Sequence, residues 1–178
     1  MSAQERRGDD RRRELAMPPG GVERRGLPDR RAEQNLRLVT FRVEQDLFAV
    51  EVMRVQEVVL GQPLTEVPLV DAAIRGLMNL RGQVVPAFEL RRVLGYADRR
   101  TDQLPIHFIV THRDGPVSLL VDEQGDYLEL NRSWLREPPP TLERRLAACL
   151  VGVCELPDSL LLVLDVDRAI DGTTPSDS

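Results

Sequence analysis

The chain has 178 residues, 24 basic side chains, all of them arginine, and 29 carboxylates, which give a formal charge of −5. This length fits one domain of ordinary size, or two small subdomains that share a core. Residues 37–178 hold fifteen arginines and twenty-two acids. Such an acidic body argues against a nucleic-acid partner, because phosphate contacts require surplus positive charge.

No stretch of the sequence approaches the roughly 18 apolar residues of a membrane span, so we expect no direct membrane insertion. The first residues carry arginines without an apolar segment behind them, unlike a secretory signal. Two cysteines, Cys149 and Cys154, are too few for a disulfide scaffold. Their odd spacing in a presumed strand favours separate core positions. These features predict a protein of a reducing compartment, the cytoplasm.

Residues 1–35 are predicted to form a disordered, arginine-rich tail, because dense charge and few apolar positions cannot offset the entropy of ordering. The tail holds a weak repeat, Glu5-Arg6-Arg7-Gly8 followed by Asp10-Arg11-Arg12, and Glu23-Arg24-Arg25-Gly26 followed by Asp29-Arg30-Arg31. Interleaved acids favour a solvated linker over a docking tag for an acidic partner, an anionic lipid or a nucleotide phosphate. Residues 173–178 are expected to form a short C-terminal tail.

From Leu36 onward the sequence alternates between short apolar runs and polar turns, a pattern typical of β-hairpins. Four hairpins are predicted, with their strands at 39–43 and 48–52, 77–80 and 84–88, 106–111 and 116–122, and 149–156 and 160–165. The loop 96–104 lies near the middle and suggests two barrel-like halves on either side. An all-β architecture follows, with only a few short helices.

Four short helical segments are predicted from capping and stop signals. Asp71 can cap a single turn through Ile74. The other three segments cover 90–94, ended by glycine, 142–148, with Thr141 as its cap, and 165–170, ended by glycine.

Several segments carry a resemblance to a known family. They are Val55-Gln56-Glu57-Val58, the run from Ile74 to Pro86 with Asn-Leu-Arg-Gly inside it, Leu90-Arg91, Leu119-Leu120-Val121-Asp122, Leu150-Val151-Gly152-Val153 and Leu162 to Asp167. With these segments, residues 36–172 resemble the CheW-like domain family. The resemblance implies two five-stranded, SH3-like β-barrel subdomains on a shared core.

The resemblance also implies a function. Stand-alone members of the family are non-enzymatic adaptors without cofactors, which couple the cytoplasmic tips of methyl-accepting chemoreceptors to the regulatory domain of a CheA-type histidine kinase. Such adaptors work in receptor arrays at the inner membrane face, where other CheW-like domains are further candidate partners. The long tail hints at an alternative, an accessory scaffold of a chemosensory pathway with a motility or second-messenger output.

The family pattern assigns receptor coupling to Glu57 and Arg81, and associates Val55 and Gly76 with the receptor contact. Arg81 is expected in a hairpin turn, where its planar guanidinium can pair with a carboxylate, and Glu57 is the candidate partner. Without the family context this pair could equally be a surface ion pair.

Three glycines and an asparagine complete the predicted set. Gly76 and Gly82 bracket the strand–turn segment, and Gly82 is counted with the receptor-coupling residues. Asn79 is expected to shape the turn through side-chain-to-backbone hydrogen bonds rather than to bind a partner. Gly152 matches a conformationally important glycine of the family.

The sequence departs from the family pattern at Ser118, Gln124 and Glu89, which casts doubt on partner contacts mainly in the later part of the chain.

Enzyme functions find little support in the sequence. His107 and His112 should point to opposite faces of a strand, and no cluster of cysteines or carboxylates completes a metal site with either. Asp165 and Asp167 could suggest a cation site, but helix capping explains them equally well. No phosphate-binding loop is possible without lysine.

Overall fold

The computed structural model describes residues 35–68, 71–100 and 102–172. The predicted tails, 1–35 and 173–178, lie outside these residues except for Asn35. Most of the described chain is β-strand, in ten segments that are joined by turns, loops and a few short helices. The strands are β1 (Asn35–Val43), β2 (Asp46–Glu51), β3 (Val55–Leu60), β4 (Ile74–Leu80), β5 (Gln83–Glu89), β6 (Ile106–His112), β7 (Gly115–Val121), β8 (Glu123–Asn131), β9 (Leu150–Glu155) and β10 (Leu160–Leu164).

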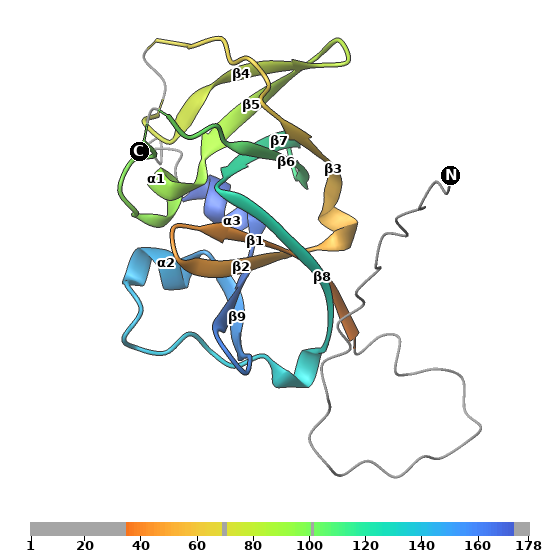
Figure 1. Ribbon diagram of the computed structural model, residues 1–178, viewed down its shortest axis with the longest axis vertical. Helices are drawn as coiled ribbons and strands as arrows, with labels where there is room; N and C mark the ends of the chain where they lie inside the picture. The colour runs from red at the N-terminus through yellow and green to blue at the C-terminus, as the bar shows by residue number, and fades with distance from the viewer. Residues whose placement is uncertain (1–34, 69–70, 101, 173–178) are drawn as a thin grey trace, which may run out of the picture.

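The strands form two five-stranded sheets, which Figure 1 shows one above the other. The lower sheet has the order β8-β1-β2-β10-β9, and the upper sheet has the order β3-β6-β7-β5-β4. Each sheet contains one parallel pair, β10 with β2 and β5 with β7, and is otherwise antiparallel. The prediction of two five-stranded, SH3-like subdomains is confirmed.

The division of the chain between the two subdomains differs from the predicted one. The loop 96–104 was expected to separate two halves, but it joins α1 (Leu90–Leu94) to β6, and β5 and β6 belong to the same sheet. The lower sheet instead combines strands from both ends of the chain. The physical reason is the parallel pairing of β10 with β2, which brings the last strand back to the first hairpin.

One apolar core joins the two sheets. Phe41 and Phe48 of the lower sheet stack with ring centroids 5.9 Å apart, and Phe41 also meets Phe108 of the upper sheet at 5.2 Å. All three rings are fully buried, and such aromatic pairs contribute about 0.5–1.5 kcal/mol beyond the area that they bury. Each barrel has a smaller core of its own, around Leu38 and Leu161 in the lower one and Met78 and Val85 in the upper one.

All four predicted hairpins are present, as the pairs β1–β2, β4–β5, β6–β7 and β9–β10. The predicted helix 90–94 is α1, which ends at Gly95 in the left-handed conformation. The predicted helix 165–170 is α3 (Val166–Asp171), whose N-cap Asp165 accepts a hydrogen bond from the backbone N–H of Arg168. Asp165 therefore caps a helix, as one of the two sequence interpretations proposed.

Two helix predictions require correction. Asp71 caps only a turn, in which its side chain accepts the N–H of Ala73, and Ile74 already begins β4 opposite Phe88. α2 covers only Arg144–Ala148, and its N-cap is Glu143 rather than Thr141. Two isolated 3-10 turns, η1 (Val52–Arg54) and η2 (Arg132–Trp134), complete the fold.

Two strands, β3 and β8, had no counterpart among the strands expected from the sequence. β3 lacks a clear alternation because four of its six residues are only partly buried. β8 is exposed over most of its length, and its register against β1 shifts between Val39 and Phe41. Hydrophobic periodicity therefore gives no signal for either strand.

Candidate partner-docking site

The turn between β4 and β5 has the backbone conformation of a two-residue hairpin. Arg81 has φ 52° and Gly82 has φ 88°, and Leu80 pairs with Gln83 across the turn. Positive φ at both central residues is typical of a type I′ turn, which glycine adopts readily and arginine seldom does. The side-chain oxygen of Asn79 accepts the N–H of Gly82 at 2.8 Å, which is the turn-shaping role predicted for Asn79.

This turn places Arg81 beside Glu57 of β3. The distance between Arg81 Nη2 and Glu57 Oε2 is 2.8 Å, so the pairing predicted from the sequence is present. The Arg81 side chain is nevertheless 79% exposed, whereas that of Glu57 is 21% exposed. A pair this exposed contributes about 0–1 kcal/mol to stability. Its geometry leaves other guanidinium N–H groups of Arg81 facing solvent, where a partner's acceptor can reach them.

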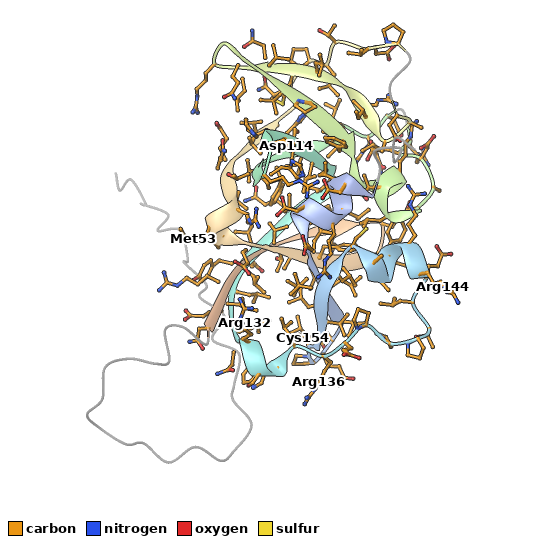
Figure 2. The ribbon with its side chains drawn as sticks, turned by 180° about the vertical axis from the view of Figure 1, so that it is seen from behind. Met53, Asp114, Arg132, Arg136, Arg144 and Cys154 are labelled. Atoms are coloured by element: carbon orange, nitrogen blue, oxygen red, sulfur yellow. The ribbon has the colours of Figure 1, made fainter. Side chains whose placement is uncertain are left out.

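The start of β3 is held by a second arginine. Arg54, the last residue of η1, donates to the Thr111 carbonyl at 3.2 Å and to Asp167 of α3 at 2.9 Å. Val55 follows, partly buried against the shared core. Met53 projects from η1 at the edge of the molecule and is 87% exposed (Figure 2). The element that carries Glu57 is thus fixed to the body and presents an exposed apolar side chain beside it.

Gly76 lies on β4 and serves the packing of a loop rather than the ion pair. The backbone of Thr65 pairs with that of Leu77 through two hydrogen bonds of 2.8 Å. A Cβ at position 76 would lie 2.6 Å from the Thr65 carbonyl oxygen, which is closer than real atoms approach. Gly76 is therefore required by the crossing loop, and its predicted part in receptor contact remains a prediction.

Gly152 lies on β9 of the lower sheet, apart from the Glu57–Arg81 pair in the upper sheet. Its neighbour Val153 pairs with Arg136 through two backbone hydrogen bonds, and a Cβ at position 152 would lie 2.8 Å from the Arg136 carbonyl oxygen. Close backbone approach explains why glycine occupies this position.

We expect Gly152→Ala to destabilise the protein by about 1–3 kcal/mol, since the added methyl group must displace the backbone of Arg136. Val151→Ala is the matched control, because Val151 is the exposed neighbour in the same strand, and such surface changes usually stay within about 0.5 kcal/mol. Urea unfolding of both variants measures the difference. Equal stabilities would show that the strand accommodates the methyl group freely.

Comparison with known proteins decides the family. The model of the CheW-like domain matches residues 37–173. This chain belongs to the CheW-like domain family. The chemotaxis protein CheW of Bacillus subtilis is 28% identical over 136 residues, which cover 76% of this chain and 86% of that protein. The probable chemotaxis protein CheW of Rhizobium etli is 27% identical over 139 residues, covering 76% and 88%.

A solved structure agrees with the fold. The scaffolding protein TtCheW from Thermoanaerobacter tengcongensis superposes with a TM-score of 0.68 at 23% identity, over 75% of this chain and 91% of that one. The resemblance predicted from the sequence motifs is confirmed, and with it the predicted class of function, a chemotaxis coupling adaptor.

A group of charges, buried except for Glu44, joins the two barrels of this CheW-like domain. Asp122 accepts hydrogen bonds from Arg91 at 2.9 Å, from Arg99, and from the backbone N–H of Glu44 at 2.6 Å. Arg91 also pairs with the carboxylate of Glu44, and Arg99 with Glu89 at 3.0 Å. The side chains of Arg91 and Arg99 are only 8% and 7% exposed. We name these five residues the junction cluster.

The charges of the junction cluster stabilise one another. Burial alone would raise the pKa of Asp122, but hydrogen bonds from Arg91 and Glu44 and the charge of Arg99 outweigh it and lower that pKa. Sequence reasoning singled out Leu90-Arg91 and the segment ending at Asp122 as family motifs without giving them a role. Those two motifs were the features of the sequence that could have indicated the cluster. Glu89, a departure from the family pattern, is the partner of Arg99.

The two histidines lie apart and serve different contacts. His107 is fully buried with Nδ1 3.0 Å from the hydroxyl of Ser118, which gives this departure from the family pattern a packing role. His112 Nε2 lies 3.3 Å from Asp171 of α3, and its Nδ1 accepts the N–H of Asp114. Within residues 35–68, 71–100 and 102–172, no group of three or more histidines, cysteines and acids could hold a metal ion.

The cysteines occupy core positions, as expected. Cys149 follows α2 and Cys154 lies in β9, both buried and without a disulfide. Burial raises the pKa of each thiol. No helix of the described residues is long and apolar enough to cross a bilayer.

The stability of the domain should fall at mildly acidic pH because of His107. Burial and the charge of Arg99 lower the pKa of this histidine below its ordinary value of 6.5, and no described residue hydrogen-bonds its Nε2. Below pH 6.5 the unfolded chain then binds more protons than the native one, so the stability is complete above pH 6.5 and declines as the pH falls from that value to the lowered pKa of His107 in the folded protein.

We therefore expect the urea midpoint of the wild type to fall more between about pH 7.5 and about pH 5.5 than that of His107→Asn, whose amide does not titrate. Other titrating groups are common to both chains and cancel in the comparison. Parallel pH profiles would contradict the assignment of the acid sensitivity to His107.

Proposed function

We propose that this adaptor couples the cytoplasmic tip of a methyl-accepting chemoreceptor to the regulatory domain of a CheA-type histidine kinase. One observation carries the receptor part of the proposal. Arg81 is fixed at its base by the turn and at its tip by Glu57, yet its side chain is 79% exposed. A guanidinium that is both oriented and exposed can bind a partner's carboxylate or carbonyl with little further ordering.

Residues near this pair support an interface rather than an isolated charge. Met53 precedes β3, Leu60 ends it, and Val84 opposes Asn79 beside the turn; all three side chains are strongly exposed. Interfaces combine such apolar contacts with a few charged contacts. Val55, Glu57, Gly76, Arg81 and Gly82 are our candidates for the receptor-coupling segment.

An adaptor requires a second face for the kinase. The barrel of the lower sheet offers one, because Trp134 of η2 and Val151 of β9 are exposed apolar residues on elements of that barrel. The buried charges of the junction cluster tie the two barrels together, so the two faces keep a fixed relative orientation. The adaptor transmits signals by holding proteins together and transforms no molecule, and it acts in the cytoplasm at receptor arrays.

A pull-down from the native cell with the full-length chain as bait tests this function. We expect a histidine kinase and a chemoreceptor among the captured proteins. The matched bait Arg81→Glu should retain the kinase and lose the receptor. Recovery of neither protein with the wild-type bait would contradict the proposed function, and equal receptor recovery with both baits would remove Arg81 from the interface.

A further inference from the structure

One edge of the lower sheet is open. β8 ends the strand order of that sheet, with β1 as its single neighbour. Among the described residues, the backbone of β8 forms ladder hydrogen bonds with β1 only. Five consecutive residues, 123–127, are exposed in this strand, which Figure 1 shows crossing the outside of the molecule. Such an edge presents unpaired N–H and C=O groups to which another extended segment can add.

The side chains of β8 indicate which segment fits. Glu123, Asp126 and Glu129 are all exposed, and none of them forms an ion pair with another described residue. Tyr127, between them, is 54% exposed. Carboxylates that flank an aromatic ring suit arginine, whose guanidinium pairs with the former and stacks on the latter. A second copy of β8 is disfavoured, because it would place like charges opposite one another.

The chain itself carries an arginine-rich segment attached at this edge. Asn35, the first residue of β1, pairs with Asn131, the last residue of β8. Residues 6–13 contain five arginines and two aspartates. The second arginine repeat is interrupted by Pro28, which removes a backbone donor that an added strand needs.

Residues 14–34, which connect the segment 6–13 to β1, are long enough for the segment to lie either parallel or antiparallel to β8. Residues 14–34 number twenty-one, and a segment of that length can span at most about 70 Å. A nine-residue strand such as β8 is about 30 Å long. Tethering therefore gives residues 6–13 an effective concentration at this edge of the order of millimolar.

We propose that the arginine-rich segment 6–13 docks on the free edge of β8 in its own chain. The segment binds by strand addition, with its arginines against Glu123, Asp126, Tyr127 and Glu129. This docking covers the one edge of the lower sheet that β8 leaves open, and it is independent of the function proposed for the Glu57–Arg81 pair.

Amide-resolved hydrogen exchange on the full-length chain tests the proposal. We compare the wild type with a variant in which five arginines are changed to glutamine, Arg6, Arg7, Arg11, Arg12 and Arg13. The β8 amides that point away from β1 should exchange about tenfold faster in the variant, because they lose their acceptors. Amides of β9, at the opposite edge of the same sheet, should not change.

Two matched variants sharpen the test. Changing Arg24, Arg25, Arg30 and Arg31 to glutamine removes a similar charge and should leave β8 exchange as in the wild type. The double variant Asp126→Asn with Glu129→Gln should also accelerate β8 exchange, because it neutralises the carboxylates on β8 that the arginines would contact. Equal β8 exchange in the wild type and the five-arginine variant would overturn the proposal. If the two proteins differed only in their binding to phosphatidylglycerol vesicles, the proposal would be overturned as well, because the arginines would then serve a lipid surface.

The concentration dependence identifies the occupant. Protection of β8 that is unchanged on tenfold dilution supports docking within one chain. Protection that disappears on dilution would overturn the proposal in favour of a segment from another copy.

Discussion

Asp122→Ala should lower the free energy of unfolding by about 3–5 kcal/mol, the cost typical of breaking a buried ion pair by removing one partner. Asp122 accepts hydrogen bonds from two guanidinium groups and one backbone N–H. Without it, the buried cations of Arg91 and Arg99 keep the carboxylates of Glu44 and Glu89 but lose the carboxylate that they share. Since whole domains are stable by about 5–15 kcal/mol, this loss is a large share of the total.

The matched control is Asp98→Ala. Asp98 pairs with Arg92 at 2.6 Å, but these side chains are 65% and 31% exposed, whereas those of Asp122 and its two arginine partners are at most 12% exposed. An exposed pair contributes about 0–1 kcal/mol. Urea unfolding followed by circular dichroism measures both variants. If Asp122→Ala cost no more than Asp98→Ala, the junction cluster would have no part in holding the barrels together.

Arg81→Glu should abolish receptor-dependent kinase stimulation while the fold remains intact. The substitution places a carboxylate opposite Glu57, where the wild type has an attractive contact of 2.8 Å, and it presents the opposite charge to a partner. The stability cost should stay within about 1 kcal/mol, since the side chain is exposed and its pair is a surface pair. Kinase stimulation with receptor membranes, compared with the circular dichroism melting curve, separates coupling from folding.

The double variant Glu57→Arg with Arg81→Glu provides the control. It restores opposite charges within the pair, but the charge that a partner meets at position 81 is negative instead of positive. Coupling should remain lost if Arg81 contacts the receptor directly. Recovered coupling in the double variant would show instead that the pair acts only by fixing β3 to the turn.

The elements that could be predicted from the sequence were those with a local signal. The hairpin at Arg81 and Gly82 is an example, because apolar runs flank the turn and its glycine readily adopts the positive φ that the turn requires. α1, ended by Gly95, is another. Family motifs added the pairing of Glu57 with Arg81, which no local pattern contains, since the two lie twenty-four positions apart.

Features that depend on long-range contacts could not be predicted. The parallel pairing of β10 with β2 decides which strands share a barrel, and it joins residues more than a hundred positions apart. The junction cluster also draws its members from separate elements, among them α1 and β5, so composition shows only that arginines and acids are abundant. Asp71 was misassigned because an aspartate caps turns and helices alike.

Co-sedimentation tests the central claim most directly. Receptor-containing membranes are mixed with the CheA-type kinase of the same cell, with and without the full-length adaptor, and the kinase in the pellet is measured. The adaptor account predicts that the kinase sediments with the receptor only when the adaptor is present. A kinase that sediments equally without the adaptor, or that stays in the supernatant with it, would contradict this account.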